Sequence, residues 1–174
     1  MYKILAILIV LPSLAMAQDI VLHPAGYDEF CKENKGFALC MEHQYRAEHK
    51  ATLEEIEKIN IQVNTEIKPL SDELHYGTPD KWAFPVDGYG DCEDVVLQKA
   101  KILYNMNYDP YKVRIIIGSF SRSHGKNDLH AVLGVTINNV EYVLDNLQND
   151  VVKLSDYKTF KVILKQKIGT NKWE

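Results

Sequence analysis

The segment that decides the fold lies between residues 130 and 145, and it reads His130-Ala131-Val132-Leu133-Gly134-Val135-Thr136-Ile137-Asn138-Asn139-Val140-Glu141-Tyr142-Val143-Leu144-Asp145. Two apolar runs flank Asn138-Asn139, and Asn tolerates the left-handed backbone that both central positions of a type I′ turn require. The segment therefore predicts a β-hairpin in which Ile137 lies opposite Val140. In that register His130 and Asp145 project from the same face as diagonal neighbours, whereas a three- or five-residue loop would place them on opposite faces.

Two helices are predicted upstream of this hairpin. Over residues 53–67 apolar side chains recur at spacings of three and four, and Thr52 with Glu55 forms a capping-box pattern at the start. A second amphipathic helix is expected over residues 92–106, with acidic residues in its first turn. Residues 71–90, between the helices, are rich in Gly and Pro and are expected to form a loop.

Further strands are expected on both sides of the hairpin. Residues 113–117 alternate in the way that a strand requires, a polar loop is expected over residues 119–128, and residues 160–164 add another strand. Helices that precede strands favour an α+β fold, with the helices packed on an antiparallel sheet. No repeat, linker or charge block divides the chain, so a single domain is expected over residues 18–174.

Composition excludes several classes of protein. Of the 174 residues, 46% are hydrophobic and 25% are charged, which are ordinary values for a globular chain and exclude disorder. Lys and Arg number 20 against 24 Asp and Glu, which gives a formal charge of -4. No basic field is available for nucleic acid or for a polybasic membrane contact.

Residues 1–17 have the pattern of a secretory signal peptide. Lys3 precedes an apolar run over residues 4–14, and Ala15-Met16-Ala17 supplies the small residues of a cleavage site. The run is shorter than the roughly 20 residues that span a bilayer. The alternative is a buried N-terminal helix, against which Pro12 argues. We therefore expect an exported chain, cleaved after residue 17, with no membrane span in its mature part.

Export changes the interpretation of the three cysteines. Cys31 and Cys40 flank a short segment that contains Gly36, and in an oxidising compartment they can close a small disulfide loop. The chain-entropy model gives such a loop roughly 2–3 kcal/mol of stability. Two free buried thiols are the alternative, and in either case Cys92 is left unpaired.

Cys92 is expected at the start of a helix, directly after Asp91. Free amides and the helix dipole at such a position stabilise a thiolate and can hold a developing oxyanion, although a merely buried cysteine is the alternative. Together with His130 and Asp145 of the hairpin, Cys92 forms a candidate Cys-His-Asp triad. His124 is an alternative base, for which the hairpin supplies no acidic partner.

The residues around this candidate triad resemble the bacterial transglutaminase-like cysteine proteinases, a family that includes periplasmic proteases that process adhesins. The similar segments are Gly90-Asp91-Cys92-Glu93-Asp94, His130-Ala131-Val132-Leu133 and Leu144-Asp145-Asn146-Leu147, with Val63-Asn64, Gly77, Asp80-Lys81-Trp82 and Pro85 further upstream. The resemblance covers most of the chain after residue 17. It departs at Val95, where many members carry an aromatic residue.

This resemblance implies a papain/transglutaminase-like core and a periplasmic location. It also implies that Cys92 is the nucleophile, His130 the general base and Asp145 the residue that orients the base. A surface adhesin is the implied candidate substrate, and an inner-membrane regulatory protein is the implied candidate partner.

The resemblance further implies a calcium ion beside the active site, held by the acidic residues that match Asp91, Glu93 and Asp94. Four carboxylates lie within the eight residues from Asp87 to Asp94, and hard oxygen ligands suit Ca²⁺. The spacing is not that of an EF-hand loop. The alternative is a helix start whose dipole favours acidic side chains.

Taken together, these features predict an exported cysteine endopeptidase that hydrolyses a peptide bond in a protein substrate. Two alternatives stay open. A transglutaminase or amidase would use the same triad and pass the acyl group to an amine, and a non-catalytic calcium-dependent binding protein would keep the fold without the chemistry.

Overall fold

The computed structural model describes residues 23–42, 47, 49–121 and 127–174. The elements, in chain order, are α1 (Ala25–Glu33), η1 (Ala38–Cys40), α2 (Leu53–Glu66), β1 (Lys68–Pro69), α3 (Asp72–His75), β2 (Tyr89–Gly90), α4 (Cys92–Asn105), η2 (Pro110–Lys112), β3 (Val113–Ser121), β4 (Asn127–Ile137), β5 (Val140–Leu144), β6 (Val152–Lys153), η3 (Leu154–Asp156) and β7 (Phe160–Lys165). The predicted signal peptide and His124 lie outside the described residues. Within the described ranges, no helix combines the length and the apolar character that crossing a membrane requires.

Five strands form one antiparallel sheet in the order β6-β5-β4-β3-β7. The predicted hairpin joins β4 and β5, and its register places Ile137 opposite Val140. Asn138 and Asn139 have φ angles of 49° and 63°, the left-handed values that a type I′ turn needs. The register on which the relation between His130 and Asp145 depends is therefore confirmed.

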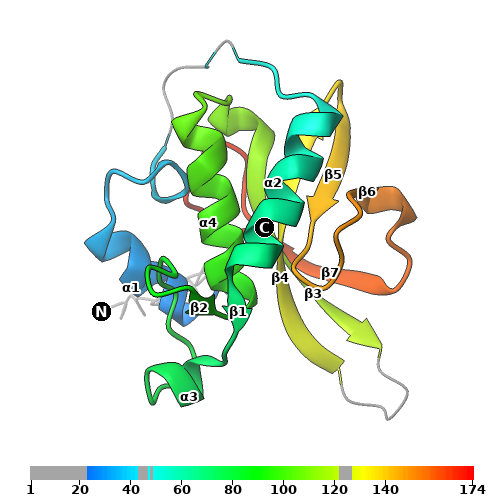
Figure 1. Cartoon of the computed structure of the whole chain (residues 1–174). Coiled ribbons are helices and arrows are strands. Elements are labelled where there is room, and N and C mark those ends of the chain that lie inside the picture. The colour runs from blue at the N-terminus through cyan, green and yellow to red at the C-terminus, as the bar shows by residue number, and fades with distance from the viewer. Residues whose placement is uncertain (1–22, 43–46, 48, 122–126) are drawn as a thin grey trace, which may run out of the picture.

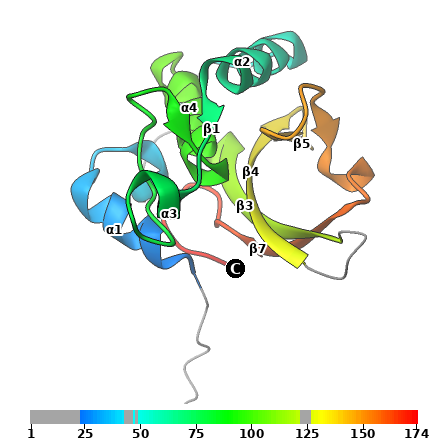
Figure 2. The same cartoon turned by 60° about the horizontal axis from the view of Figure 1, so that its bottom comes forward.

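Two helices, α2 and α4, lie side by side across one face of the sheet (Figures 1 and 2). The core between the two layers includes Val63 of α2, Leu97 of α4 and Leu133 of β4, all with no exposed surface. On the other face a smaller cluster joins Ile116 and Val132 to residues of the β6–β7 region. Both faces of the central strands are thus buried, and β4 is the middle strand of the sheet.

The predicted helices are confirmed. Helix α2 starts with the capping box of Thr52 and Glu55, and α4 starts at Cys92. The structure corrects the predicted loops. Residues 71–90 include α3 and the short strand β2, which pairs in parallel with β1. Strand β3 continues to Ser121 and β4 already begins at Asn127, because cross-strand pairing there overrides the polar local sequence.

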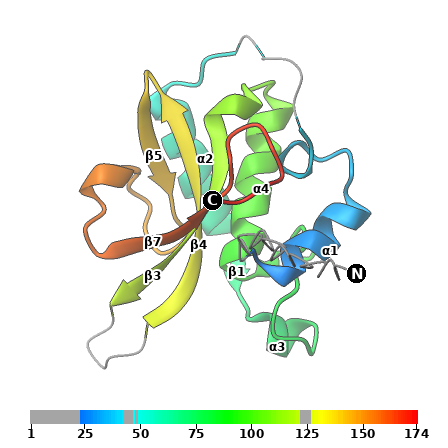
Figure 3. The same ribbon diagram turned by 180° about the vertical axis from the view of Figure 1, so that it is seen from behind.

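The first described helix, α1, was not predicted, and tertiary contacts hold it in place. A disulfide between Cys31 and Cys40 joins α1 to η1. The hydroxyl of Tyr27 donates to Leu39 O, and Gln166 Nε2 donates to both of those oxygens from beyond the end of β7. Seen from behind, the C-terminal segment runs past the helical layer toward this region (Figure 3). Contacts far along the chain therefore fix α1, which short-range patterns do not reveal.

Candidate active site

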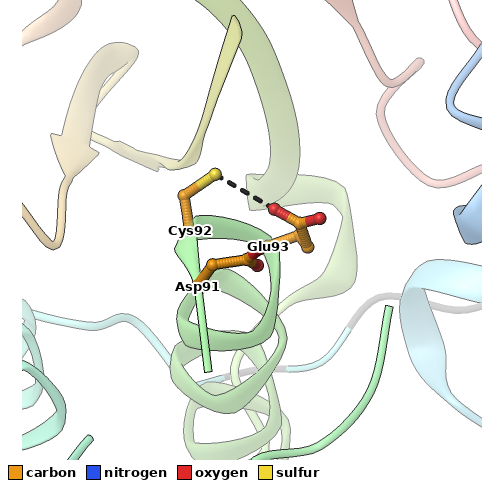
Figure 4. Close-up of side chains that lie close together, drawn as sticks. All are labelled: Asp91, Cys92 and Glu93. Carbon is orange, nitrogen blue, oxygen red and sulfur yellow. Dashed lines mark hydrogen bonds between the residues drawn. The ribbon is translucent and has the colours of Figure 1, made fainter. Parts of the chain in front are cut away.

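Cys92 is the first residue of α4, where the helix meets the middle of β4. The backbone N–H of Ala131 donates a hydrogen bond to Cys92 Sγ across 3.4 Å. The thiol itself donates to Glu93 Oε2, at 3.0 Å, and Figure 4 shows these two side chains turned toward one another at the helix start. The candidate nucleophile therefore lies beside the residue that follows His130.

His130 and Asp145 form a hydrogen-bonded pair. His130 Nε2 lies 2.8 Å from Asp145 Oδ1, and both residues are buried. An ionised carboxylate can only accept, so Nε2 carries the proton, and Nδ1 of a neutral ring is left to accept one. The structure thus brings all three predicted triad residues into one place, while their catalytic roles stay a prediction.

Asp145 is held by more than the histidine. Its Oδ1 also accepts from the N–H of Leu147 at 2.9 Å, and its Oδ2 accepts from the hydroxyl of Tyr157 at 2.6 Å. Burial alone would raise the pKa of Asp145, but the hydrogen bonds and the His130 charge outweigh burial and hold that pKa below its usual value. Asn64 on α2 fixes the backbone as well, because its Nδ2 donates to Asp145 O at 2.9 Å.

The charge state of Cys92 differs from the expectation for a helix start. Burial raises the pKa of the thiol well above its ordinary value, and the Glu93 carboxylate raises it further, against the opposing effect of the Ala131 amide. The favourable amides are opposed by the loss of water and by a carboxylate one residue away. In this arrangement the thiol donates a hydrogen bond to Glu93.

An aromatic cluster surrounds the imidazole of His130. The ring centroid of Phe120 lies 5.4 Å from that of His130, and Phe160 lies 6.3 Å away in an edge-on arrangement. Tyr157 packs against both phenylalanines while its hydroxyl reaches Asp145. The cluster limits the orientations that the imidazole can take.

Lys99 is a buried basic residue whose charge interacts with that of Asp145. It lies two helical turns along α4 from Cys92, has no exposed surface, and its Nζ has no hydrogen-bond partner among the described residues. Burial lowers the pKa of Lys99 to about 7, while the charge of Asp145 acts in the opposite direction. A buried amine therefore interacts electrostatically with the buried carboxylate of the pair.

The predicted metal ligands Asp91, Glu93 and Asp94 belong to a larger acidic cluster, which also contains Asp72 and Asp80. Ligand oxygens of Asp72, Asp91 and Asp94 lie within 4.8 Å of one another, and so do those of Asp72, Asp80 and Glu93. Burial, followed by repulsion from neighbouring carboxylates, raises the pKa of Asp91 to about 7. Burial likewise raises the pKa of Asp94 to about 7.

The donor set of this acidic cluster fits calcium. The atoms Asp72 Oδ1, Asp91 Oδ1 and Asp94 Oδ2 are buried without a hydrogen-bond partner among the described residues. Unpaired buried carboxylate oxygens are costly unless a cation offsets them, and an all-oxygen set suits a hard ion. The other oxygens of Asp72 and Asp94 accept from the backbone N–H groups of Lys81 and Ala83, which orients both carboxylates.

Sequence reasoning missed several residues of this site. Asp72 lies about twenty positions before Cys92, inside a segment expected to be a loop. Tyr157 lies after the end of the predicted hairpin. Neither carries a local pattern. Trp82 is an aromatic anchor of this region, 4% exposed and packed on Tyr27. Its Nε1 donates to Asp80, which in turn accepts from Gly26 N.

A cysteine at the start of a helix that packs on a sheet with a hydrogen-bonded His–Asp pair defines the papain- and transglutaminase-like class of thiol enzymes. Comparison with family models narrows this class. Residues 17–174 match the family described as bacterial transglutaminase-like cysteine proteinase BTLCP, and the chain belongs to that family. A search of the curated proteins gave no match.

Solved structures of LapG from Legionella pneumophila are similar to this chain. The calcium-bound LapG structure matches with a TM-score of 0.54 and 26% identity, covering 64% of this chain and 62% of LapG. A second LapG structure covers 67% of this chain and 66% of its own, with a TM-score of 0.53 and 26% identity. An EGTA-treated LapG structure also matches with a TM-score of 0.53. The similarity thus spans a little under two thirds of the first LapG chain, and it supports the α+β papain-like core.

Proposed function

We propose that this protein is an exported cysteine endopeptidase that hydrolyses a peptide bond in a protein substrate. The observation that carries the proposal is the placement of Cys92 Sγ at the amide of Ala131, the residue that follows His130 of the buried His130–Asp145 pair. Membership of a cysteine proteinase family supports it. Export and a periplasmic location rest on the signal-peptide pattern of residues 1–17.

In the proposed reaction His130 acts as the base. Its Nδ1 accepts the proton of Cys92, and the thiolate attacks the carbonyl carbon of the substrate, with the backbone N–H groups at the start of α4 stabilising the oxyanion. The C–N bond then breaks while His130 returns the proton to the leaving amine. Water, deprotonated by the same imidazole, attacks the thioester and releases Cys92.

We also propose that the acidic cluster binds calcium through Asp91, Glu93 and Asp94, together with Asp72 and Asp80. When bound, calcium supplies positive charge that offsets the mutual repulsion of these carboxylates. Glu93 belongs both to the acidic cluster and to the hydrogen bond of the thiol, so it links the proposed calcium site to Cys92. The calcium-bound and EGTA-treated structures of LapG support this assignment by similarity.

The activity is tested by comparing surface and periplasmic proteins of cells that carry the wild type or Cys92→Ala. We expect one or a few proteins, with a surface adhesin as the first candidate, to be cleaved only with the wild type. Identical profiles would contradict the proposal. An inner-membrane regulatory protein is the proposed partner, and pull-down from a membrane fraction with purified Cys92→Ala tests it.

The alternatives are separated by two measurements on the purified protein. Offering a lysine amine together with water shows which nucleophile takes the acyl group, and amide formation would favour a transglutaminase. Titration with iodoacetamide tests the non-catalytic alternative. If Cys92 reacts at the same rate in the wild type and in His130→Ala, the imidazole does not activate the thiol. Turnover that is undiminished by EGTA would refute a calcium requirement.

A further inference from the structure

The loop that follows β5 carries Asp145, and strand pairing ends just before it. Strand β5 pairs with β4 up to Leu144, which lies opposite Leu133, so Asp145 is one residue beyond the last paired position. Pairing resumes only at Val152 of β6. Contacts outside the sheet must therefore hold the 145–149 loop, which lies beside α2 (Figure 1).

Two asparagines on α2 hold this loop. Asn60 and Asn64 are four residues apart and so lie on the same face of the helix. Asn60 Nδ2 donates to Gln148 O at 3.0 Å and to Asn149 O at 2.9 Å. Asn64 Nδ2 donates to Asp145 O at 2.9 Å and to Gln148 O at 3.1 Å. Both ends of the loop are thus bonded to one helix.

Neither asparagine is required by the helix or by the core. Asn60 has no exposed surface, although it lies among the apolar residues that α2 buries. Burying an amide costs free energy that its hydrogen bonds must offset, and asparagine favours a helix less than leucine does. The Oδ1 atoms of Asn60 and Asn64 are buried and have no hydrogen-bond partner among the described residues, so part of that cost stays. The two amides therefore serve the loop rather than the stability of α2.

The loop determines the geometry of the His130–Asp145 pair. It carries Asp145, whose Oδ1 lies 2.8 Å from His130 Nε2, and it also supplies the N–H of Leu147, which donates to the same oxygen. On the other side of these contacts, α2 is fixed in the core by Ile56 and Val63, both with no exposed surface. A displacement of the loop from α2 would thus move the carboxylate and one of its donors together.

We propose that Asn60 and Asn64 are positioning residues, which hold the 145–149 loop on α2 and so keep Asp145 at His130. The proposal rests on the proposed function and adds two residues to the groups that support the activation of Cys92. Both amides act through the backbone of the loop, and hence through Asp145 and the imidazole that it orients.

The first test replaces each asparagine by leucine, which is similar in size, favours a helix and cannot donate a hydrogen bond. The probe is iodoacetamide, and mass spectrometry follows its rate. In the reaction the Cys92 sulfur bonds to the methylene carbon, iodide leaves, and the imidazole takes the thiol proton. We expect Asn60→Leu and Asn64→Leu to react about threefold to tenfold more slowly than the wild type, the effect of lost hydrogen bonds to the loop. Gln62→Leu, which removes an exposed amide of α2 bonded to Glu66, should react like the wild type.

A double-mutant cycle separates positioning from a general effect on the fold. In a protein that already carries His130→Ala, we expect Asn64→Leu to cause no further slowing, because no imidazole remains for Asp145 to orient. Asparagine variants that react like the wild type, or that slow alkylation equally with and without His130, would overturn the proposal. A wild-type thiol that reacts no faster than His130→Ala contradicts the proposed function as well.

A second variant covers the case in which leucine does not fit beside the loop. Asn64 is half-buried, and Asn64→Ala adds no atom that could clash, while alanine favours a helix most of all residues. The readout is the exchange of the His130 Nε2 proton with water, measured by NMR. We expect this exchange to be about threefold to tenfold faster in Asn64→Ala than in Gln62→Ala, because the Asp145 acceptor is held less firmly. If the proton exchanges at the same rate in both variants, the proposal is wrong.

Discussion

Asp145 is a fully buried carboxylate, and it stays ionised because the hydrogen bonds that it accepts outweigh the effect of burial on its pKa. His130 and Leu147 donate to Oδ1, and Tyr157 donates to Oδ2. Each donor stabilises the charged form, and the charged form keeps the His130 proton on Nε2. The third donor, Tyr157, therefore supports the function of the triad although it does not touch the thiol.

Tyr157→Phe tests this role. Loss of a hydrogen bond to a charged group costs about 1.5–3 kcal/mol, so we expect kcat to fall about tenfold or more with little change in KM. The pKa of Asp145 rises toward its usual value, so the acid limb of the pH–rate profile moves to higher pH. Tyr142→Phe, on β5, is the control. A pH profile that does not move would contradict the role.

Gly90 allows the close approach of Asp94 to the backbone before Cys92. A Cβ at this position would lie 2.7 Å from Cβ and from Oδ2 of Asp94. Gly90→Ala must therefore displace a carboxylate of the acidic cluster, and such overpacking costs about 1–3 kcal/mol. We expect calcium affinity, measured by calorimetry, to fall about tenfold. Gly36→Ala, whose Cβ meets nothing within 4 Å, should bind calcium like the wild type.

At the scale of the element, α4 carries the thiol at its start and a buried amine in its middle. The pKa of Lys99 is about 7 in the folded protein against roughly 10.4 in the unfolded chain. Between these values the unfolded chain binds the proton and the folded protein does not, so this residue makes stability rise as pH rises from 7 to 10. Below pH 7 the folded protein holds a buried cation, which the charge of Asp145 favours.

Lys99→Met removes this buried cation. We expect the free energy of unfolding at pH 7 to increase by about 1–3 kcal/mol, and the rise in stability between pH 7 and pH 10 to flatten. Activity should fall, because Asp145 loses a positive neighbour. Urea denaturation at the two pH values measures the effect. Lys58→Met, on the exposed face of α2, should leave stability nearly unchanged.

The elements that sequence reasoning predicted are those with a local signal. The hairpin has its Asn-Asn turn, α2 has its capping box, and α4 has its apolar stripe. The triad residues could be found because each belongs to such an element or directly follows it. Other residues acquire their roles only through interactions across the fold, which no spacing in the sequence indicates. Tyr157 and Lys99 interact with Asp145, and Asp72 belongs to the acidic cluster. The pKa of the Cys92 thiol likewise depends on burial and on the direction of the Glu93 side chain, which no sequence pattern reveals.

At the scale of the whole molecule, the disulfide closes a short loop within the N-terminal region, where it joins α1 to η1. Cys31 and Cys40 are nine positions apart, a loop for which the chain-entropy model gives about 2–3 kcal/mol. We expect Cys31→Ser/Cys40→Ser to lose about this free energy of unfolding, as measured in urea. Dithiothreitol should lower the stability of the wild type to the same level. A reductant that has no effect on the wild type would contradict a stabilising disulfide.

The acidic cluster joins three successive parts of the chain, namely α3, the loop that contains Asp80 and the start of α4. A ligand that binds only where these parts meet stabilises the folded state by about 2.7 kcal/mol at a concentration one hundred times its Kd. For a chain of this size that corresponds to a rise of roughly 5–10 °C in the thermal midpoint. We expect calcium to produce this rise, EGTA to reverse it, and Asp72→Asn to abolish most of it, since Asp72 belongs to two of the carboxylate triplets. Asp156→Asn, an exposed acid on η3, should respond to calcium like the wild type. The same midpoint with calcium and with EGTA would show that the cluster does not bind the ion, whatever the outcome of the activity assays.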